Sequence, residues 1–277
     1  MPTLDLEAEY NNRRRVPNHP AIQERWSKAS DEFVKSASAD LDKSYGAHAR
    51  HKYDHFRPRS GSGNAPLVVY IHGGYWQRGD RKGNAFVAKE LVSRGIQVAL
   101  PSYRLAPEAS VMDIVGDLRE FLKKIWDVTK QRPVVVGHSA GGHLAAAMLA
   151  TDWSKAGGGV PADLVKCAYA ISGVFDLEPL IPTSLNEALK LDAAQAKAAS
   201  PILWTAPPKD RTLVAAAGGD ESQEFIRQAL AIASVWGKAG VKAECVVVPG
   251  ADHFTIVDQL ANGDSAMLAR VVGLTGK

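Results

Sequence analysis

The sequence predicts a doubly wound α/β fold, in which helices cover both faces of a mostly parallel sheet. Two observations lead to this prediction. Short runs of Val, Ile, Leu and Ala recur along the chain, and such continuous apolar strands are typical of parallel sheets buried on both faces. Longer segments with apolar residues at helical spacing separate the runs, which indicates alternating strands and helices.

The first elements of this pattern have clear ends. Residues 67–71 form an apolar run that predicts a strand, and residues 86–94 predict a helix that Gly95 terminates, since glycine is common just after a helix. Residues 96–100 predict the next strand, and Pro101 stops it because proline cannot donate to a central ladder.

The middle of the chain holds the central strand. Residues 111–130 carry apolar side chains at helical spacing, residues 133–136 are the apolar run Pro-Val-Val-Val, and residues 140–151 form an Ala-rich helix. In the C-terminal part, three further apolar runs predict strands and two segments predict helices. The strands are 167–171, 212–217 and 243–248, and the helices are 222–238 and 263–272.

Two segments fall outside the alternation of strands and helices. Residues 5–44 are polar and helix-like around Pro17 and Pro20, and predict an N-terminal extension. Residues 173–210 contain five prolines and are too long for a plain connection between strand and helix. We interpret this second segment as a small cap inserted over the active site, within a single domain that spans residues 1–277.

Composition excludes several classes of protein. Lys and Arg total 33 against 30 Asp and Glu, so the formal net charge of +3 gives no argument for nucleic acid or membrane partners. The basic residues 13–15 and 48–59 are interpreted as solvated surface with a few salt bridges. A small-molecule substrate is therefore the expected partner.

The cysteines and the N-terminus bear on cofactors and on location. Cys167 and Cys245 each lie in an apolar run, so we expect buried strand thiols rather than a disulfide scaffold or a metal site. Residues 1–9 are acidic and lack the apolar segment of a signal peptide. No run reaches the ~18 apolar residues of a membrane span, and we expect a cytoplasmic protein.

The segment Gly137-His138-Ser139-Ala140-Gly141 lies between the central strand and its helix. A Gly-x-Ser-x-Gly turn in this position is a nucleophile elbow, which holds the serine hydroxyl exposed above the sheet edge. Ser139 is therefore the candidate nucleophile. His253 follows the last strand on a loop that can reach the same edge, and it is the candidate base, since the base comes last in this chain order.

The acid that orients the base must follow a strand between these two residues. Asp220 fits best, because it follows the strand at 212–217 and a flexible Gly-Gly pair. Glu221 is the nearest alternative and Asp176 is a second one. Asp252 adjoins His253, and neighbouring side chains rarely meet in the required geometry.

A second glycine cluster predicts the oxyanion hole. The strand at 67–71 runs into His72-Gly73-Gly74-Tyr75-Trp76, where glycines let backbone N–H groups point inward. Gly74, with Gly73 as the neighbouring choice, and Ala140 after the nucleophile are the expected donors.

Other residues near these motifs carry weaker expectations. Tyr75 and Trp76 either line the substrate site or hold the loop down. His138 and His143 are expected to be packing residues, and His72 is expected to hydrogen-bond within its own loop.

The motifs together resemble the arylformamidase (kynurenine formamidase) branch of the α/β-hydrolases. The resemblance rests on HGGYWQ (72–77), GHSAGGH (137–143), ISGVFDL (171–177), DESQEF (220–225) and DHF (252–254), and it includes segments near the N-terminus. It implies an α/β-hydrolase fold and an N-formylkynurenine deformylase of tryptophan catabolism, with Ser139, Asp220 and His253 as its triad. The segment YRLAPE (103–108) also resembles hormone-sensitive-lipase-like esterases, which usually carry a third glycine where this chain has Tyr75.

The expected reaction is acyl transfer to water through an acyl-enzyme, which requires no metal or organic cofactor. For an N-formyl aryl amide the acyl side is small, and we expect Tyr75, Trp76 and Phe175 to wall a wide leaving-group side. A carboxylesterase acting on small esters is the close alternative, and a non-catalytic binding module on the same fold is the remote one. A homodimer is the expected assembly.

Overall fold

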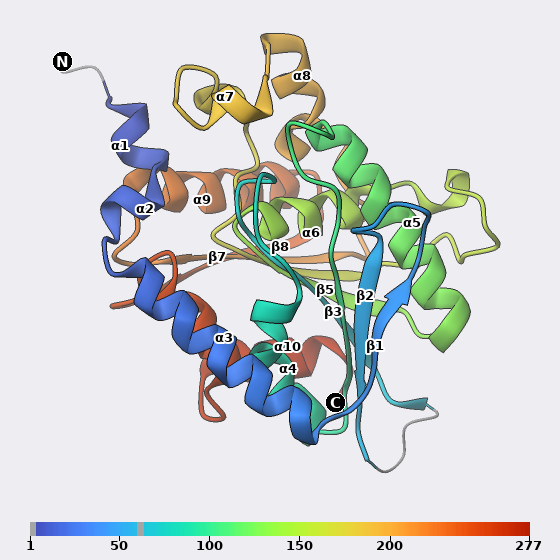
Figure 1. Cartoon of the computed structure of the whole chain (residues 1–277). Coiled ribbons are helices and arrows are strands. Elements are labelled where there is room, and N and C mark those ends of the chain that lie inside the picture. Colours follow the sequence, from blue (N-terminus) through green and yellow to red (C-terminus); the bar gives the residue numbers. More distant parts are fainter. Residues whose placement is uncertain (1–3, 60–63) are drawn as a thin grey trace.

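The computed structural model describes residues 4–59 and 64–277, so Met1–Thr3 at the start of the acidic N-terminal stretch lie outside it. Its centre is an eight-stranded sheet in the order β1-β2-β4-β3-β5-β6-β7-β8 (Figure 1). The strands are β1 (Ser38–Ser44), β2 (Lys52–Arg57), β3 (Leu67–Ile71), β4 (Gln97–Pro101), β5 (Pro133–His138), β6 (Cys167–Ile171), β7 (Thr212–Gly218) and β8 (Lys242–Val248).

The sheet is parallel from β4 to β8 and antiparallel at one edge. Val69 of β3 pairs with Ala99 of β4 and with Val135 of β5, and the parallel ladders continue through β6, β7 and β8. At the other edge, β1 pairs antiparallel with β2, and β2 pairs antiparallel with β4. The predicted mostly parallel sheet is confirmed.

Helices cover both faces of the sheet, as the apolar strands require. Side chains of β3 alternate between two cores, because successive strand residues point to opposite faces. One core lies under α5 (Val111–Thr129), α6 (Ala140–Ala150) and α9 (Gln223–Lys238), and the other lies under α3 (His19–Ser36), α4 (Ala88–Ser93) and α10 (Ala266–Leu274). Figure 1 shows the two groups of helices on opposite sides of the strands.

Most predicted elements are found within a few residues of their expected ends. The helix expected at 86–94 is divided into a 3₁₀ segment, η2 (Lys82–Val87), and the α-helix α4. The final helix begins at Ala266 rather than at residue 263. Cys167 and Cys245 lie in strands, but they are half-buried rather than buried.

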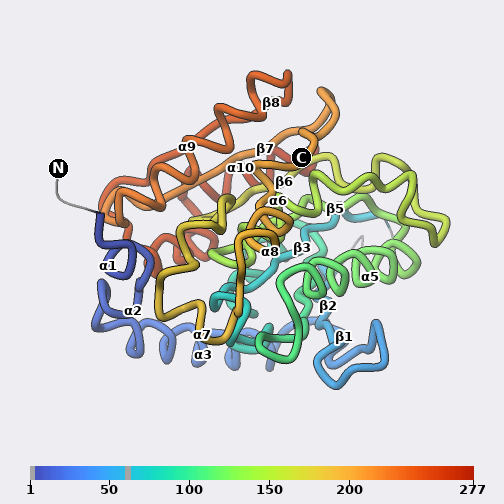
Figure 2. Tube along the Cα trace, turned by 90° about the horizontal axis from the view of Figure 1, so that it is seen from above, coloured from blue at the N-terminus to red at the C-terminus, as the bar shows by residue number. Residues whose placement is uncertain are grey.

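The N-terminal extension differs most from expectation. It contains α1 (Leu6–Tyr10), α2 (Asn12–Arg15) and α3, but residues 38–44 form the edge strand β1. The sequence SADLDKS lacks an apolar alternation because most of this strand is exposed. Figure 2, seen from above, shows α1 beside the start of α9, far from it in sequence.

Strand β2 was also missed, because charged and polar residues interrupt it. Its Asp54 is buried and pairs with Arg81 at 3.1 Å, and its His55 is buried and bonds to Gln97 at 3.0 Å. Both polar side chains therefore have partners inside the fold. The interpretation of residues 48–59 as solvated surface is wrong for this strand.

The insertion at 173–210 holds four short helical segments beyond the end of β6. They are η4 (Glu178–Leu180), α7 (Asn186–Leu189), α8 (Ala193–Ala198) and η5 (Pro201–Leu203). Figure 1 shows α7 and α8 as a separate cluster beyond α6, on the side away from α3. No helix within residues 4–59 and 64–277 is long and apolar enough to cross a membrane.

Candidate active site

Ser139 lies at the tight turn between β5 and α6. Its φ of 57° is unusual for a residue other than glycine, as expected for a strained nucleophile elbow. A Cβ on Gly137 would lie 2.0 Å from the carbonyl oxygen of Gly141, and a Cβ on Gly141 would lie 2.0 Å from that of Ile71. The turn therefore has no room for any larger residue at its two glycines.

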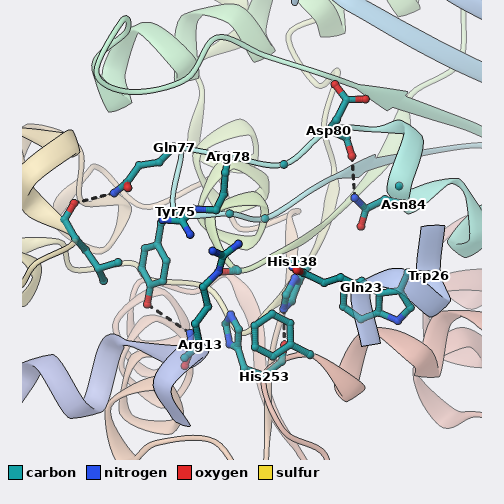
Figure 3. Close-up of a pocket in the computed structure, with 18 of the residues that line it drawn as sticks. Arg13, Gln23, Trp26, Tyr75, Gln77, Arg78, Asp80, Asn84, His138 and His253 are labelled. Atoms are coloured by element: carbon teal, nitrogen blue, oxygen red, sulfur yellow. Dashed lines mark hydrogen bonds between the residues drawn. The ribbon is translucent and has the colours of Figure 1, made fainter. Parts of the chain in front are cut away.

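His253 stands at the same edge of the sheet and contacts a carboxylate. Its Nδ1 lies 2.7 Å from Oε2 of Glu221, and both side chains are buried. Because a carboxylate oxygen accepts hydrogen bonds, Nδ1 of His253 is the donor in this contact, and Nε2 is the ring nitrogen left to take a proton. His253 and Ser139 line one cavity (Figure 3), and no hydrogen bond joins them among the described residues.

The Glu221 carboxylate is itself held by two donors. Its Oε1 accepts from the backbone N–H of Gly218 at 2.6 Å and from the hydroxyl of Ser172. Ser172 adopts a φ of 50° at the end of β6, where its own N–H donates to Ala216 of β7. No pattern in the sequence singles out Ser172, because serines that follow strands are common.

The prediction that Asp220 orients the base is wrong. The backbone N–H of Gly219 donates to Val248 and that of Asp220 donates to Ala251. In this arrangement the Asp220 side chain is exposed to solvent, and the next residue, Glu221, is turned inward. Glu221, the nearest alternative in the sequence, occupies the position beside His253.

The two other acidic alternatives have local roles. Asp176 accepts the backbone N–H of Glu178 through Oδ1. Asp252 accepts the N–H groups of Phe254 and Thr255, also through Oδ1. Neither carboxylate contacts His253.

Three backbone N–H groups near Ser139 have no acceptor among the described residues: those of Gly73, Gly74 and Ala140. Ala140 is the first residue of α6, where helices leave N–H groups unpaired. Gly73 is pressed against the elbow, since a Cβ there would lie 2.9 Å from Cβ of Ser139. These donors are available for an oxyanion, and that role remains a prediction.

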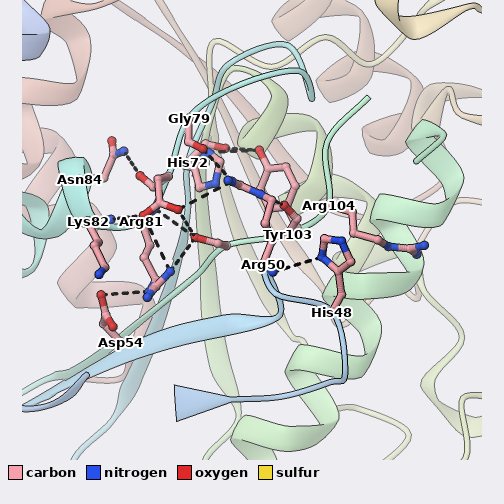
Figure 4. A network of polar contacts seen from close by, with 12 residues as sticks. His48, Arg50, Asp54, His72, Gly79, Arg81, Lys82, Asn84, Tyr103 and Arg104 are labelled. Carbon is pink, nitrogen blue, oxygen red and sulfur yellow. Dashed lines mark hydrogen bonds and ion pairs between the residues drawn. The ribbon is translucent and has the colours of Figure 1, made fainter. Parts of the chain in front are cut away.

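A polar network fixes the loop that carries the two glycines (Figure 4). Arg50 donates to the carbonyl oxygens of Gly79 and Tyr103, both at 2.7 Å. The Tyr103 hydroxyl donates to the carbonyl of His72 at 2.8 Å, and the two rings stack 4.4 Å apart. His72 bonds to the carbonyl of Gly73, so its expected role within the loop is confirmed. Burial lowers the pKa of His72 to about 4.

Two further histidines, His138 and His143, lie close to the nucleophile in the sequence and have different partners. Nε2 of His138 donates to the backbone carbonyl of His253 at 2.7 Å, so His138 positions the base as well as packing beside the sheet. Nε2 of His143 donates to the carbonyl of Ala199 at 2.7 Å, which confirms a packing role and ties α6 to the insertion. Burial lowers the pKa of His138 well below its usual value and that of His143 to about 4.

The predicted aromatic walls are only partly correct. Tyr75 lines the cavity, and its hydroxyl donates to the carbonyl of Tyr10. Trp76 is fully buried with its ring 4.9 Å from that of His143, and Phe175 is fully buried beneath Gly173. Trp76 and Phe175 are therefore core residues that support the loops rather than walls of the cavity.

The cavity has a volume of about 510 Å³, which is within the usual range for small-molecule sites. Several segments of the chain line it. Ser184 and Leu185 of the insertion line it, as does Phe254 next to the base. Five more lining residues come from the N-terminal extension, which the sequence pattern does not predict. We call this set the N-terminal wall: Asn11, Asn12, Arg13, Gln23 and Trp26.

Within the described ranges, no three His, Cys, Asp or Glu side chains form a group that could hold a metal ion. The chemistry that the site can perform from its own groups is nucleophilic. A strained serine at an elbow, a histidine held by a buried carboxylate and unpaired backbone donors beside the serine define a serine hydrolase of the α/β-hydrolase class.

Comparison with known proteins agrees with this class. The BD-FAE family model matches residues 53–223. The kynurenine formamidase of Danio rerio is 31% identical over 99% of this chain and 96% of that protein. A solved protein from Silicibacter sp. TM1040, provisionally described as a thioesterase, has a TM-score of 0.86 at 31% identity over 98% of this chain and 100% of that one. A Pyrobaculum calidifontis esterase of 23% identity, with 93% of this chain and 92% of that one covered, shares the fold at a TM-score of 0.70.

The chain belongs to the BD-FAE family of α/β-hydrolases and is a hydrolase similar to the kynurenine formamidases. The resemblance inferred from its motifs is confirmed.

Proposed function

We propose that the protein hydrolyses an N-formyl aryl amide such as N-formylkynurenine through a formyl-enzyme on Ser139. The observation that carries this proposal is the buried Glu221–His253 pair at the elbow, in a chain similar to kynurenine formamidases over nearly its whole length. The aromatic side chains that line the cavity, Tyr75, Trp26 and Phe254, suit an aryl leaving group.

In the first half of the reaction, Ser139 Oγ attacks the formyl carbon while Nε2 of His253 takes its proton. Glu221 stabilises the imidazolium through the hydrogen bond to Nδ1. The N–H groups of Ala140 and of Gly73 or Gly74 hold the oxyanion, and one such donor typically contributes on the order of 10²–10³ in rate. His253 then gives its proton to the departing aryl amine, which leaves a formyl ester on Ser139.

In the second half, a water molecule attacks the formyl ester while His253 takes a proton from that water. The Ser139–carbon bond breaks, His253 returns the proton to Oγ, and formate leaves. The acyl group is only a formyl, so the elbow side of the site needs little space. This suits the close approach of Gly73 to Ser139.

The decisive experiment compares kcat/KM for N-formylkynurenine with that for short p-nitrophenyl esters. We expect the formamide to be the better substrate, with stoichiometric release of formate. Ester turnover that exceeds formamide turnover by orders of magnitude would overturn the proposal. In that case a carboxylesterase, which the similar fold of the Pyrobaculum calidifontis esterase favours, would take its place.

A fluorophosphonate probe separates both enzymes from a non-catalytic binding protein. We expect one equivalent of label on Ser139 and none on the Ser139→Ala variant. Absence of label on the folded wild-type protein would support the binding protein.

We also expect a cytoplasmic homodimer. Leu230 and Val235 of α9 and Val247 of the edge strand β8 are exposed apolar side chains, and α9 packs beside β8. Light scattering should give the mass of a dimer, and fractionation should place the protein with cytoplasmic markers. A concentration-independent monomer or a secreted protein would overturn these expectations.

A further inference from the structure

Two arginines without a carboxylate partner face each other across the active-site cavity. Arg13 comes from α2 and Arg78 from the loop after β3, and both line the cavity. Figure 3 shows their guanidinium ends turned toward each other near Tyr75 and His253. Neither guanidinium forms an ion pair or a hydrogen bond with any described residue.

The charge of this pair is not neutralised from within the fold. Burial and the nearby charge of Arg78 lower the pKa of Arg13. Asp80 also lines the cavity, but it accepts the hydroxyl of Ser102 at 2.9 Å and lies 3.8 Å from both Arg50 and Arg81. Two facing cations repel each other, and an anion between them would remove that cost.

The position of Arg13 is determined by buried contacts rather than left to a flexible terminus. Next to it, Asn12 is buried and donates to the Tyr75 hydroxyl at 3.4 Å, and that hydroxyl donates to the carbonyl of Tyr10. Tyr10 is anchored in turn, because its hydroxyl donates to Glu224 of α9 at 2.7 Å. Arg13 is thus held at the cavity by the anchored residues Tyr10 and Asn12, which precede it, and by Tyr75 of the glycine loop.

We propose that Arg13 and Arg78 form a subsite for a carboxylate on the leaving-group portion of the substrate. Guanidinium groups suit this ligand, because their planar donors match the two oxygens of a carboxylate. N-formylkynurenine carries an α-carboxylate on its amino-acid portion, which departs with the aryl amine. The inference rests on the proposed function only for the nature of the bond that is cleaved, and the subsite itself can be tested on esters.

The test uses two aryl acetates that differ only at one carboxyl group, which is ionised in 3-acetoxybenzoate and a neutral methyl ester in methyl 3-acetoxybenzoate; hydrolysis of the acetyl ester is measured in both. The measured quantity is the ratio of their kcat/KM values at low ionic strength, for the wild type and for the Arg13→Gln and Arg78→Gln variants. Charge-assisted hydrogen bonds of this kind change affinity by about tenfold to a hundredfold. We expect each variant to lower the anionic-to-neutral ratio by about tenfold or more.

Arg14→Gln is the matched control, since Arg14 neighbours Arg13 in α2 but does not line the cavity. Its ratio should stay within about twofold of wild type, and Arg13→Lys, which keeps the charge, should retain part of the preference. Thermal unfolding midpoints near that of wild type show that each variant is folded, and Arg13→Lys keeps the test open if Arg13→Gln does not fold.

The outcomes separate the two proposals. If the ester ratio falls as expected while N-formylkynurenine is not hydrolysed, the subsite holds and the proposed function fails. If N-formylkynurenine is hydrolysed but neither arginine variant changes the ratio, or Arg14→Gln changes it equally, the subsite is wrong.

Discussion

The carboxyl edge of the sheet and the N-terminal wall of the cavity are built in opposite ways. At the edge, the Glu221 side chain is fully buried, and both of its oxygens have partners. In the wall, Asn12 and Trp26 are buried anchors, but Arg13 is exposed and without a partner. The edge is organised before substrate arrives, whereas the wall holds a charge that no described residue neutralises.

The largest difference between the two regions should appear on removal of the nucleophile. Ser139→Ala should lower kcat by about 10⁴-fold or more, because the other groups of such a site contribute little without it. Steady-state kinetics with N-formylkynurenine measure this effect, and thermal unfolding checks the fold. Ser184→Ala, which alters the same cavity away from the elbow, should keep most activity. Comparable losses in both variants would contradict the assignment of the nucleophile to Ser139.

The acid of the edge gives the next largest effect. Glu221→Gln should reduce kcat by about 10³–10⁴-fold, since the amide can hold the wrong tautomer of His253 and cannot stabilise its charged form. Asp220→Asn, one residue away and exposed, should change kcat by less than about threefold, and Asp176→Asn should do likewise. If Asp220→Asn were the more damaging variant, the hydrogen bond between Glu221 and His253 would not describe the working enzyme.

Burial at the edge should also make the protein sensitive to acid. The pKa of His143 is lowered to about 4 in the folded state, whereas an unfolded histidine titrates near 6.5. The unfolded chain therefore binds more protons between these values, and stability is lost as the pH falls from about 6.5 toward 4. By this linkage His143 should cost about 2 kcal/mol of unfolding free energy at pH 5.

Urea unfolding at pH 8 and pH 5 measures this cost. His143→Gln keeps a donor for the carbonyl of Ala199 and should lose less stability on acidification than wild type. The control His48→Gln alters a histidine outside the core and should behave as wild type. An equal acid effect in His143→Gln and wild type would contradict the prediction.

The smallest effect belongs to the wall. Tyr75→Phe removes the hydroxyl that bonds to the carbonyl of Tyr10 and to Asn12, a loss that typically amounts to about 1 kcal/mol. The wall should then hold substrate less well, so KM should rise about threefold to tenfold with kcat changed less than about twofold. A fall in kcat at constant KM would instead place Tyr75 in the chemical step.

The sequence predicts the edge far better than the wall, for a physical reason. Parallel strands such as β5 are buried on both faces and must be apolar, so their pattern is plain. The elbow glycines are required by close contacts that no other residue allows. Both features leave a local signature that can be read without any knowledge of distant contacts.

The features that were missed depend on long-range pairing. Whether Asp220 or Glu221 faces His253 is decided by how the loops after β7 and β8 pair, and adjacent acidic residues give no sign of it. Arg13 reads as solvated surface because its place at the cavity depends on Tyr75, which lies far along the chain. Strand β2 was hidden by Asp54 and His55, whose buried partners lie in other segments.

The close contact between Gly73 and Ser139 has a consequence for engineering. A Cβ at residue 73 would lie only 2.9 Å from Cβ of Ser139. The glycine loop and the elbow are in such close contact that random substitution at residues 72–74 or 137–142 would destroy far more variants than it improves. Libraries should instead vary Asn11, Arg13 and Leu185, which line the cavity outside these two segments. Variants with new substrate preferences should be found at these positions, and the hydrolytic reaction should stay the same.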